Sequence, residues 1–161
     1  MFAGLPPFVL VHVLITFVAI FSGFVVIFGL FSSSRGDLWP AVFLFFTVLT
    51  NVTGFALFAG FTPAFFTGIV SSLVAVITIL ARFTFRMAGA WRPIYAAGAV
   101  ISLYLNVFVL ITQSFLKVPS LHALAPHAPA NPEPPFAIVQ ALVLLAFVIA
   151  GFFAVKRFRP A

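Results

Sequence analysis

The chain has 161 residues, of which 64% are hydrophobic and 6% charged, and its mean hydropathy is +1.29. This composition excludes a soluble globular domain and predicts contact with a lipid bilayer. The net charge of +6 does not indicate a nucleic-acid partner, because the basic residues stand in short stretches between apolar runs, where membrane topology explains them. Cysteine is absent, which excludes disulfides and thiolate metal sites.

Five apolar runs follow one another, each about as long as the roughly 20 residues that cross a bilayer core. Pro6 and Pro7 precede the first run, which suits a helix start because the missing N–H groups would be unbonded there. We interpret this run as a retained span, since it has no basic leader and no cleavage site. We expect spans at residues 8–31, 39–59, 63–83, 93–116 and 135–155. The sequence therefore predicts one all-α domain over residues 1–161, an integral membrane bundle of five transmembrane helices.

The basic residues predict the orientation of this bundle. With five spans, Arg35, the three arginines of residues 82–92 and the tail from Lys156 share one side, which then holds seven of the eight Lys and Arg residues. The positive-inside rule puts that side in the cytoplasm, with the N-terminus outside and the C-terminus inside. A re-entrant hairpin of the second and third runs would keep the same bias. A full crossing pair and a re-entrant hairpin therefore both remain open.

Residues 117–134 form the one long stretch that apolar residues do not dominate. This stretch is rich in proline and holds His122, His127 and Glu133. Prolines favour extended chain over helix. We expect an outer loop that lies in extended form across the outer mouth of the bundle.

Polar and small residues within the first four spans fall at helical spacing. Such stripes are typical of close helix packing in lipid, where burial of apolar surface no longer separates inside from outside. We interpret them mainly as packing surfaces. The stripes are His12, Thr16, Ala19 and Gly23; Thr47, Asn51 and Gly54; Gly68, Ser72 and Ala75; and Ser102, Asn106, Gln113 and Lys117.

His12 differs from these residues because an ionisable side chain within a span is a functional candidate by default. An interfacial histidine that reaches headgroups or water is the alternative. The first span opens with PPFVLVH and the fifth with PPFAIVQ, which places His12 and Gln140 at matching depth. Gln113 lies near the outer end of the fourth span. We predict an outer-face pocket of His12, Gln113 and Gln140, with Glu133 and His122 nearby.

The residue types in this pocket favour ligand binding over catalysis. Nucleophile motifs are absent and the only acids are Asp37 and Glu133, so we predict no catalytic residue and do not favour an enzyme. Three histidines without short spacing, and no C-x-x-C-H motif, predict no metal site. A quinone or lipid, with His12 or Gln140 hydrogen-bonded to a carbonyl, and haem remain candidates. The cofactor stays unassigned.

Four runs carry a family resemblance: TxxTNVTGF at 47–55, AGAWRxIY at 88–95, LYLNVFVLITQSFLKVP at 103–119, and LAP…EPPF…Q at 124–140. They resemble an uncharacterised family of small multi-span bacterial inner-membrane proteins. The resemblance covers nearly the whole chain and implies a multi-pass protein of the bacterial inner (cytoplasmic) membrane, without a catalytic residue. The family loop between LAP and EPPF is shorter and richer in Thr and Ser, so no role is implied for His127.

Two functional hypotheses follow. The first is a non-enzymatic accessory or structural subunit of a larger membrane assembly, with other membrane protein subunits as partners and one flat lipid-facing side rich in small residues and Phe. The second is a membrane protein that binds a small molecule or redox cofactor (a quinone, a lipid or haem) at its periplasmic face.

Overall fold

The computed structural model describes residues 6–34, 36–57 and 60–159, and this part of the chain contains helices and no strand. The helices are α1 (Pro7–Phe31), α2 (Leu38–Phe55), α3 (Pro63–Ile79), the π-helix η1 (Leu80–Thr84), α4 (Trp91–Lys117), the short α5 (Pro119–His122) and α6 (Pro134–Arg157). With η1 counted as the end of α3, five are long and apolar enough to cross a membrane. The chain is a multi-pass membrane protein, and the predicted all-α fold is confirmed.

Prolines start several of these helices. Pro7, Pro63 and Pro134 are the first residues of α1, α3 and α6, where a missing N–H costs no hydrogen bond. Thr62 caps α3, because its hydroxyl accepts a hydrogen bond from the backbone N–H of Phe65 at 3.2 Å. The predicted end of the second span at residue 59 lies outside the described residues.

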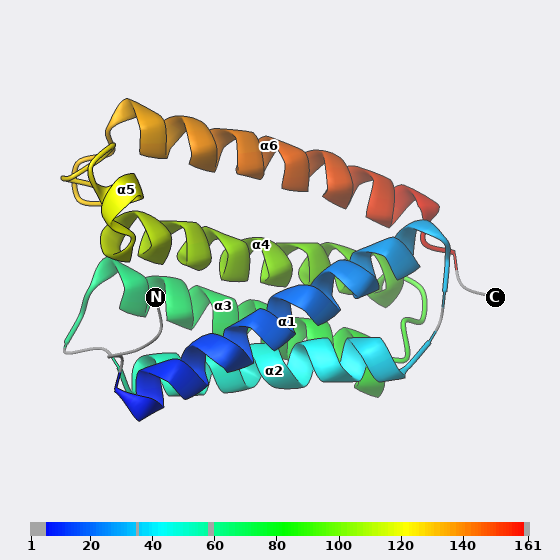
Figure 1. Ribbon diagram of the computed structural model, residues 1–161. Coiled ribbons are helices and arrows are strands. Elements are labelled where there is room, and N and C mark those ends of the chain that lie inside the picture. Colours follow the sequence, from blue (N-terminus) through cyan, green and yellow to red (C-terminus); the bar gives the residue numbers. More distant parts are fainter. Residues whose placement is uncertain (1–5, 35, 58–59, 160–161) are drawn as a thin grey trace.

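The five long helices run along the length of the bundle, and successive helices point in opposite directions (Figure 1). α2 and α3 each pass from one end of the bundle to the other, and both are long and apolar enough to cross a membrane, which is the arrangement expected of a full crossing pair. One end holds the α1–α2 turn, the α3–α4 turn and the C-terminal tail; we call it the basic end. The other holds the start of α1, the α2–α3 turn and residues 118–133; we call it the proline-rich end.

The apolar core fills the half of the bundle that lies toward the basic end. It is built from the second half of α1, the first halves of α2 and α4, and the tail, with the fully buried side chains of Leu30, Phe43, Leu44, Tyr95, Leu103 and Phe158 at its centre. The helices approach closely here, because a Cβ atom at Gly23 would lie 2.7 Å from Leu103 Cδ1 and 2.8 Å from Phe43 Cε2. The predicted packing role of the small-residue stripes is confirmed at Gly23.

Arg82 joins three elements at the basic end. The π-turn of η1, closed by a hydrogen bond from Phe85 N–H to Leu80 O at 2.9 Å, brings this arginine to the start of α2. Its guanidinium donates to Gly36 O at 2.9 Å and to Asp37 Oδ1 at 2.6 Å, and lies 5.1 Å from the centre of the Tyr95 ring. The positive-inside rule accounted for Arg82 by orientation alone, whereas the structure also gives it a packing role.

The C-terminal tail closes the same end. Arg92 donates to Phe158 O at 2.7 Å, and the Ser33 hydroxyl donates to Arg157 O at 2.8 Å. The basic stretches at residues 82–92 and 156–159 therefore meet the α1–α2 turn, as the five-span topology predicts. Arg35, the remaining basic residue assigned to this side, lies outside the described residues.

The proline-rich segment is not the extended strap that the sequence predicts. Pro119 starts the short helix α5, and turns follow it. Ala125 and Ala128 are buried with Phe115 of α4 and Phe136 of α6. The expectation of extended chain across the mouth of the bundle is wrong, because Pro119 stands at a helix start, where proline is tolerated, and the alanines gain burial by packing between α4 and α6.

Candidate functional site

A cavity of about 390 Å³ lies among α1, α2, α3 and α4, in the half of the bundle toward the proline-rich end. Apolar side chains such as Val13, Phe17 and Val109 form much of its wall. Its polar lining residues are His12, Thr16, Thr50, Asn51, Thr67, Ser71, Asn106, Gln113 and Lys117. The chain thus gathers polar groups from four helices around one space inside the predicted membrane region.

The cavity extends along α4 from Lys117, which is exposed at the helix end, to Asn106, which is buried. At 1.5 Å of rise per residue this distance is about 16 Å. At the inner end, the Asn106 amide donates to Thr47 Oγ1 at 3.2 Å and so joins α4 to α2. The cavity is therefore elongated along α4, with Lys117 near one end and Asn106 near the other.

His12 and Asn51 are held by hydrogen bonds on one side only. His12 Nδ1 lies 2.7 Å from Thr53 Oγ1 on α2. Asn51 Oδ1 accepts from the Ser71 hydroxyl of α3 at 3.1 Å, while its Nδ2 is buried without a partner among the described residues. The hydroxyl of Thr50 is also buried there without a partner. His12 and Asn51 are therefore held in place and keep unused hydrogen-bonding capacity.

The structure brings together two of the three predicted site residues. His12 and Gln113 line the cavity, whereas Gln140 donates to Phe108 O and to Thr112 Oγ1, both at 3.2 Å. Phe108 and Thr112 lie on the side of α4 that faces α6, away from the cavity. Matching depth in the membrane does not determine which side of a neighbouring helix a residue contacts, and Gln140 is separated from His12 for that reason.

Gln140 therefore serves α4–α6 packing, and we expect Gln140→Leu to change the free energy of unfolding by less than about 1 kcal/mol. Its two hydrogen bonds are long, and its Oε1 is already buried without a partner among the described residues. The loss of the two hydrogen bonds is therefore offset by the removal of a buried, unpaired oxygen. Unfolding in mixed detergent micelles, followed by circular dichroism, measures this change. A loss of several kcal/mol would contradict the packing role.

Glu133 also interacts with a residue outside the cavity. Its carboxylate accepts from the backbone N–H of His127 at 3.0 Å and lies 3.0 Å from His127 Nδ1. The hydrogen bonds from His127 hold the pKa of Glu133 below its usual value. His122, at the end of α5, is exposed. Glu133 and His127 thus close the proline-rich turn, and neither lines the cavity.

The lowered pKa makes this closure depend on pH. A carboxyl group whose pKa is depressed in the folded state stabilises that state above its ordinary pKa, and the contribution disappears as the pH falls through the folded-state pKa. We expect the His127 amide proton to be protected from exchange near neutral pH and to lose protection below the usual carboxyl range. Amide exchange measured by nuclear magnetic resonance tests this, with Glu133→Ala expected to remove the protection at every pH.

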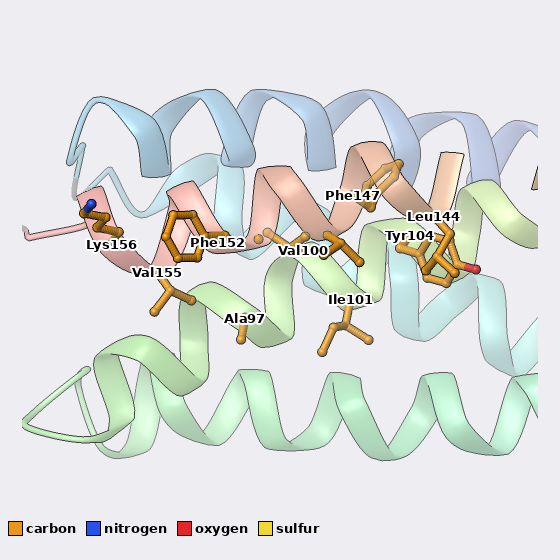
Figure 2. A pocket seen from close by; sticks show the side chains of 11 residues that line it. Ala97, Val100, Ile101, Tyr104, Leu144, Phe147, Phe152, Val155 and Lys156 are labelled. Carbon is orange, nitrogen blue, oxygen red and sulfur yellow. The ribbon is translucent and has the colours of Figure 1, made fainter. Parts of the chain in front are cut away.

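A second concave surface, of about 630 Å³, lies between α4 and α6 (Figure 2). Its walls include Val100, Tyr104, Leu144 and Phe147, and Lys156 stands at its basic end. The Lys156 ammonium lies 5.7 Å from the Phe152 ring centre. This groove offers almost no polar group along its length. It therefore offers far fewer polar groups to a ligand than the α1–α4 cavity does.

Sequence reasoning missed part of the cavity. Thr50 and Ser71 were not singled out, and Asn51 and Asn106 were assigned to packing. Their position along the bundle axis could have identified them. Because α2 and α4 run antiparallel to α1 and α3, these residues lie at similar positions along that axis, in the same half of the bundle. Among the described residues, no group of three or more His, Asp or Glu side chains is placed to hold a metal ion.

Comparisons with models of protein families, with curated proteins and with solved structures find no match to this chain, so the resemblance seen in the sequence identifies no family.

Proposed function

We propose that this multi-pass membrane protein binds a small amphipathic molecule in the cavity among α1, α2, α3 and α4. The polar group of the molecule lies between His12, Asn51 and Lys117, and its apolar part lies along Val13 and Phe17. Small-molecule sites are typically concave and mostly apolar, with a few convergent polar groups that fix the ligand. The α1–α4 cavity has this composition.

The observation that carries the proposal is the pair of unused polar groups at Thr50 and Asn51. A buried polar group without a partner costs about 1–3 kcal/mol, and native proteins contain few of them. Both groups belong to residues that line the same cavity. Both atoms are buried, so a small shift of these side chains toward the cavity would bring them within reach of a bound molecule. Hydrogen bonds to that molecule would then remove this cost, which is a source of affinity that the apolar α4–α6 groove does not have.

Purification in mild detergent, followed by native mass spectrometry and an absorption spectrum, tests the proposal. We expect an amphipathic molecule to remain with the wild-type protein and to be depleted in Asn51→Leu, which keeps the side-chain size and removes the amide. Gln140→Leu is the matched control, because it removes an amide outside the cavity, and it should retain the molecule. Equal retention by Asn51→Leu would overturn the proposal, and so would a wild-type protein that carries no such molecule.

We propose that this cavity lies on the outer side of the membrane, with the N-terminus outside. Support comes from the clustering of basic side chains at the end opposite the cavity. The absence of native cysteine permits a direct test with single-cysteine variants at two exposed alanines. A membrane-impermeant maleimide should label Ala130→Cys in intact cells and leave Ala88→Cys unlabelled. The reverse labelling pattern would show that the orientation is the opposite of the one proposed.

Placement in a bacterial inner membrane rests on the sequence resemblance and stays a prediction.

A role as an accessory subunit is the second candidate function, and α6 favours it. Only 6% of the α6 span is buried inside the protein, against 44% for α4. Its exposed side chains include Leu142, Leu145, Val148 and Phe152. A helix of a partner subunit would cover this face, as lipid also does. Stoichiometric partner polypeptides in the mild-detergent preparation would support the accessory role, and a protein that purifies alone would count against it.

A further inference from the structure

The hydrogen bonds around Thr53 determine which nitrogen of His12 carries the proton. The Thr53 hydroxyl lies 2.7 Å from Leu49 O, 3.2 Å from Thr50 O and 2.7 Å from His12 Nδ1. A hydroxyl has one proton, and a backbone carbonyl can only accept. If Thr53 donated to His12, its oxygen would face the Leu49 carbonyl lone pairs at 2.7 Å without a proton between them. Thr53 therefore donates to Leu49, and His12 Nδ1–H donates to Thr53.

This assignment leaves Nε2 of His12 as a hydrogen-bond acceptor. A neutral imidazole has one N–H and one lone pair, and the N–H is used at Thr53. Within the described part of the chain Nε2 has no hydrogen-bond partner, and His12 lines the cavity. A charged imidazolium at this depth in a span would carry a desolvation cost, which favours the neutral form.

We infer that the molecule in the cavity presents a hydroxyl or N–H group to Nε2 of His12. The inference rests on the proposed function and names the class of ligand: an amphipathic alcohol, phenol or amine whose donor lies beside an acceptor for Asn51 or Lys117. It reverses the expectation from the sequence that His12 donates to a ligand carbonyl. A quinone, which offers only carbonyl oxygens, leaves Nε2 unpaired, whereas the corresponding quinol satisfies it.

The protonation of His12 can be measured without any ligand. Nitrogen-15 resonance of protein with labelled histidine, in lipid nanodiscs, separates a nitrogen that bears a proton from one that does not. The chain has three histidines, and the signal that disappears in His12→Asn belongs to His12. We expect a protonated Nδ1 and an unprotonated Nε2. A protonated Nε2 would overturn the inference and leave the cavity as a candidate binding site.

Two probes that differ only in the methylation of one hydroxyl test the ligand class. para-Heptylphenol carries a donor hydroxyl, and para-heptylanisole replaces it with a methyl ether that can only accept. We expect the wild-type protein to bind the phenol roughly tenfold more tightly than the ether, as one buried hydrogen bond would give. Asparagine at position 12 reaches only as far as Nδ1, so His12→Asn should keep the Thr53 contact and lose the preference. Glutamine reaches as far as Nε2, so His12→Gln should restore much of it.

The results of these two binding experiments distinguish an error in the ligand class from an error in the proposed function. Equal binding of both probes by the wild type, or an unchanged preference in His12→Asn, would overturn the inference and leave cavity binding intact. Failure of both probes to bind would overturn the proposed function and the inference together.

Discussion

Gly98→Ala is expected to lower the free energy of unfolding by about 1–3 kcal/mol, because it inserts a methyl group where α4 and α3 are already in contact. A Cβ atom at Gly98 would overlap the hydroxyl of Thr78 and lie 3.2 Å from its Cβ. Thr78 is fully buried, and its hydroxyl donates to Val74 O at 2.7 Å, so it has no free space into which to move. The helices must separate or the Thr78 side chain must leave its rotamer.

Unfolding in mixed detergent micelles measures this effect, and two variants make the result specific. Gly151→Ala is the matched control on α6, because its added Cβ would meet Val100 Cγ1 at 3.5 Å, which is ordinary contact, and its stability should stay close to that of the wild type. Thr78→Ala combined with Gly98→Ala should recover part of the loss. A Gly98→Ala protein as stable as Gly151→Ala would show that the α3–α4 contact is looser than the structure has it.

The number and approximate ends of the spans could be predicted from the sequence, because the length of apolar runs and the prolines at their starts are local signals. The depth of His12 and Gln113 followed from the same counting, and both residues line one cavity. The neighbour of Gln140 could not be predicted, because it depends on how α6 is rotated and which side of α4 it contacts. That rotation is set by packing over the whole length of the two helices.

The sequence also could not predict that the core fills the half of the bundle toward the basic end while the α1–α4 cavity lies in the other half. The small residues Ala19 and Gly23 and the polar residues His12 and Thr16 form one continuous stripe on α1, yet the first pair packs against the core and the second pair lines the cavity. What separates them is the size of the side chains opposite. Phe43 and Leu103 fill the space beside Gly23, whereas Gly54, which has no side chain, lies opposite His12.

The bundle can hold an open cavity at the proline-rich end because its basic end is tightly packed. Among the side chains at the basic end, we expect Arg82 to contribute most to the free energy of unfolding. We expect Arg82→Met to lower the free energy of unfolding by about 3 kcal/mol, because it removes charge-assisted hydrogen bonds to Gly36 and Asp37 from a site where the arginine side chain is 2% exposed. Arg86→Met, in the same turn but at an exposed position, is the matched control and should change stability by no more than about 0.5 kcal/mol.

Asp37→Asn separates the charge of this pair from its hydrogen bonds. The Asp37 side chain is 87% exposed, so water screens its attraction to Arg82, and we expect a loss of under about 1 kcal/mol. The same micelle unfolding experiment ranks the three variants, with Arg82→Met well below Asp37→Asn and Arg86→Met near the wild type. If Asp37→Asn were as unstable as Arg82→Met, the ion pair itself would hold the basic end together. If Arg82→Met were as stable as Arg86→Met, orientation would remain the whole role of Arg82.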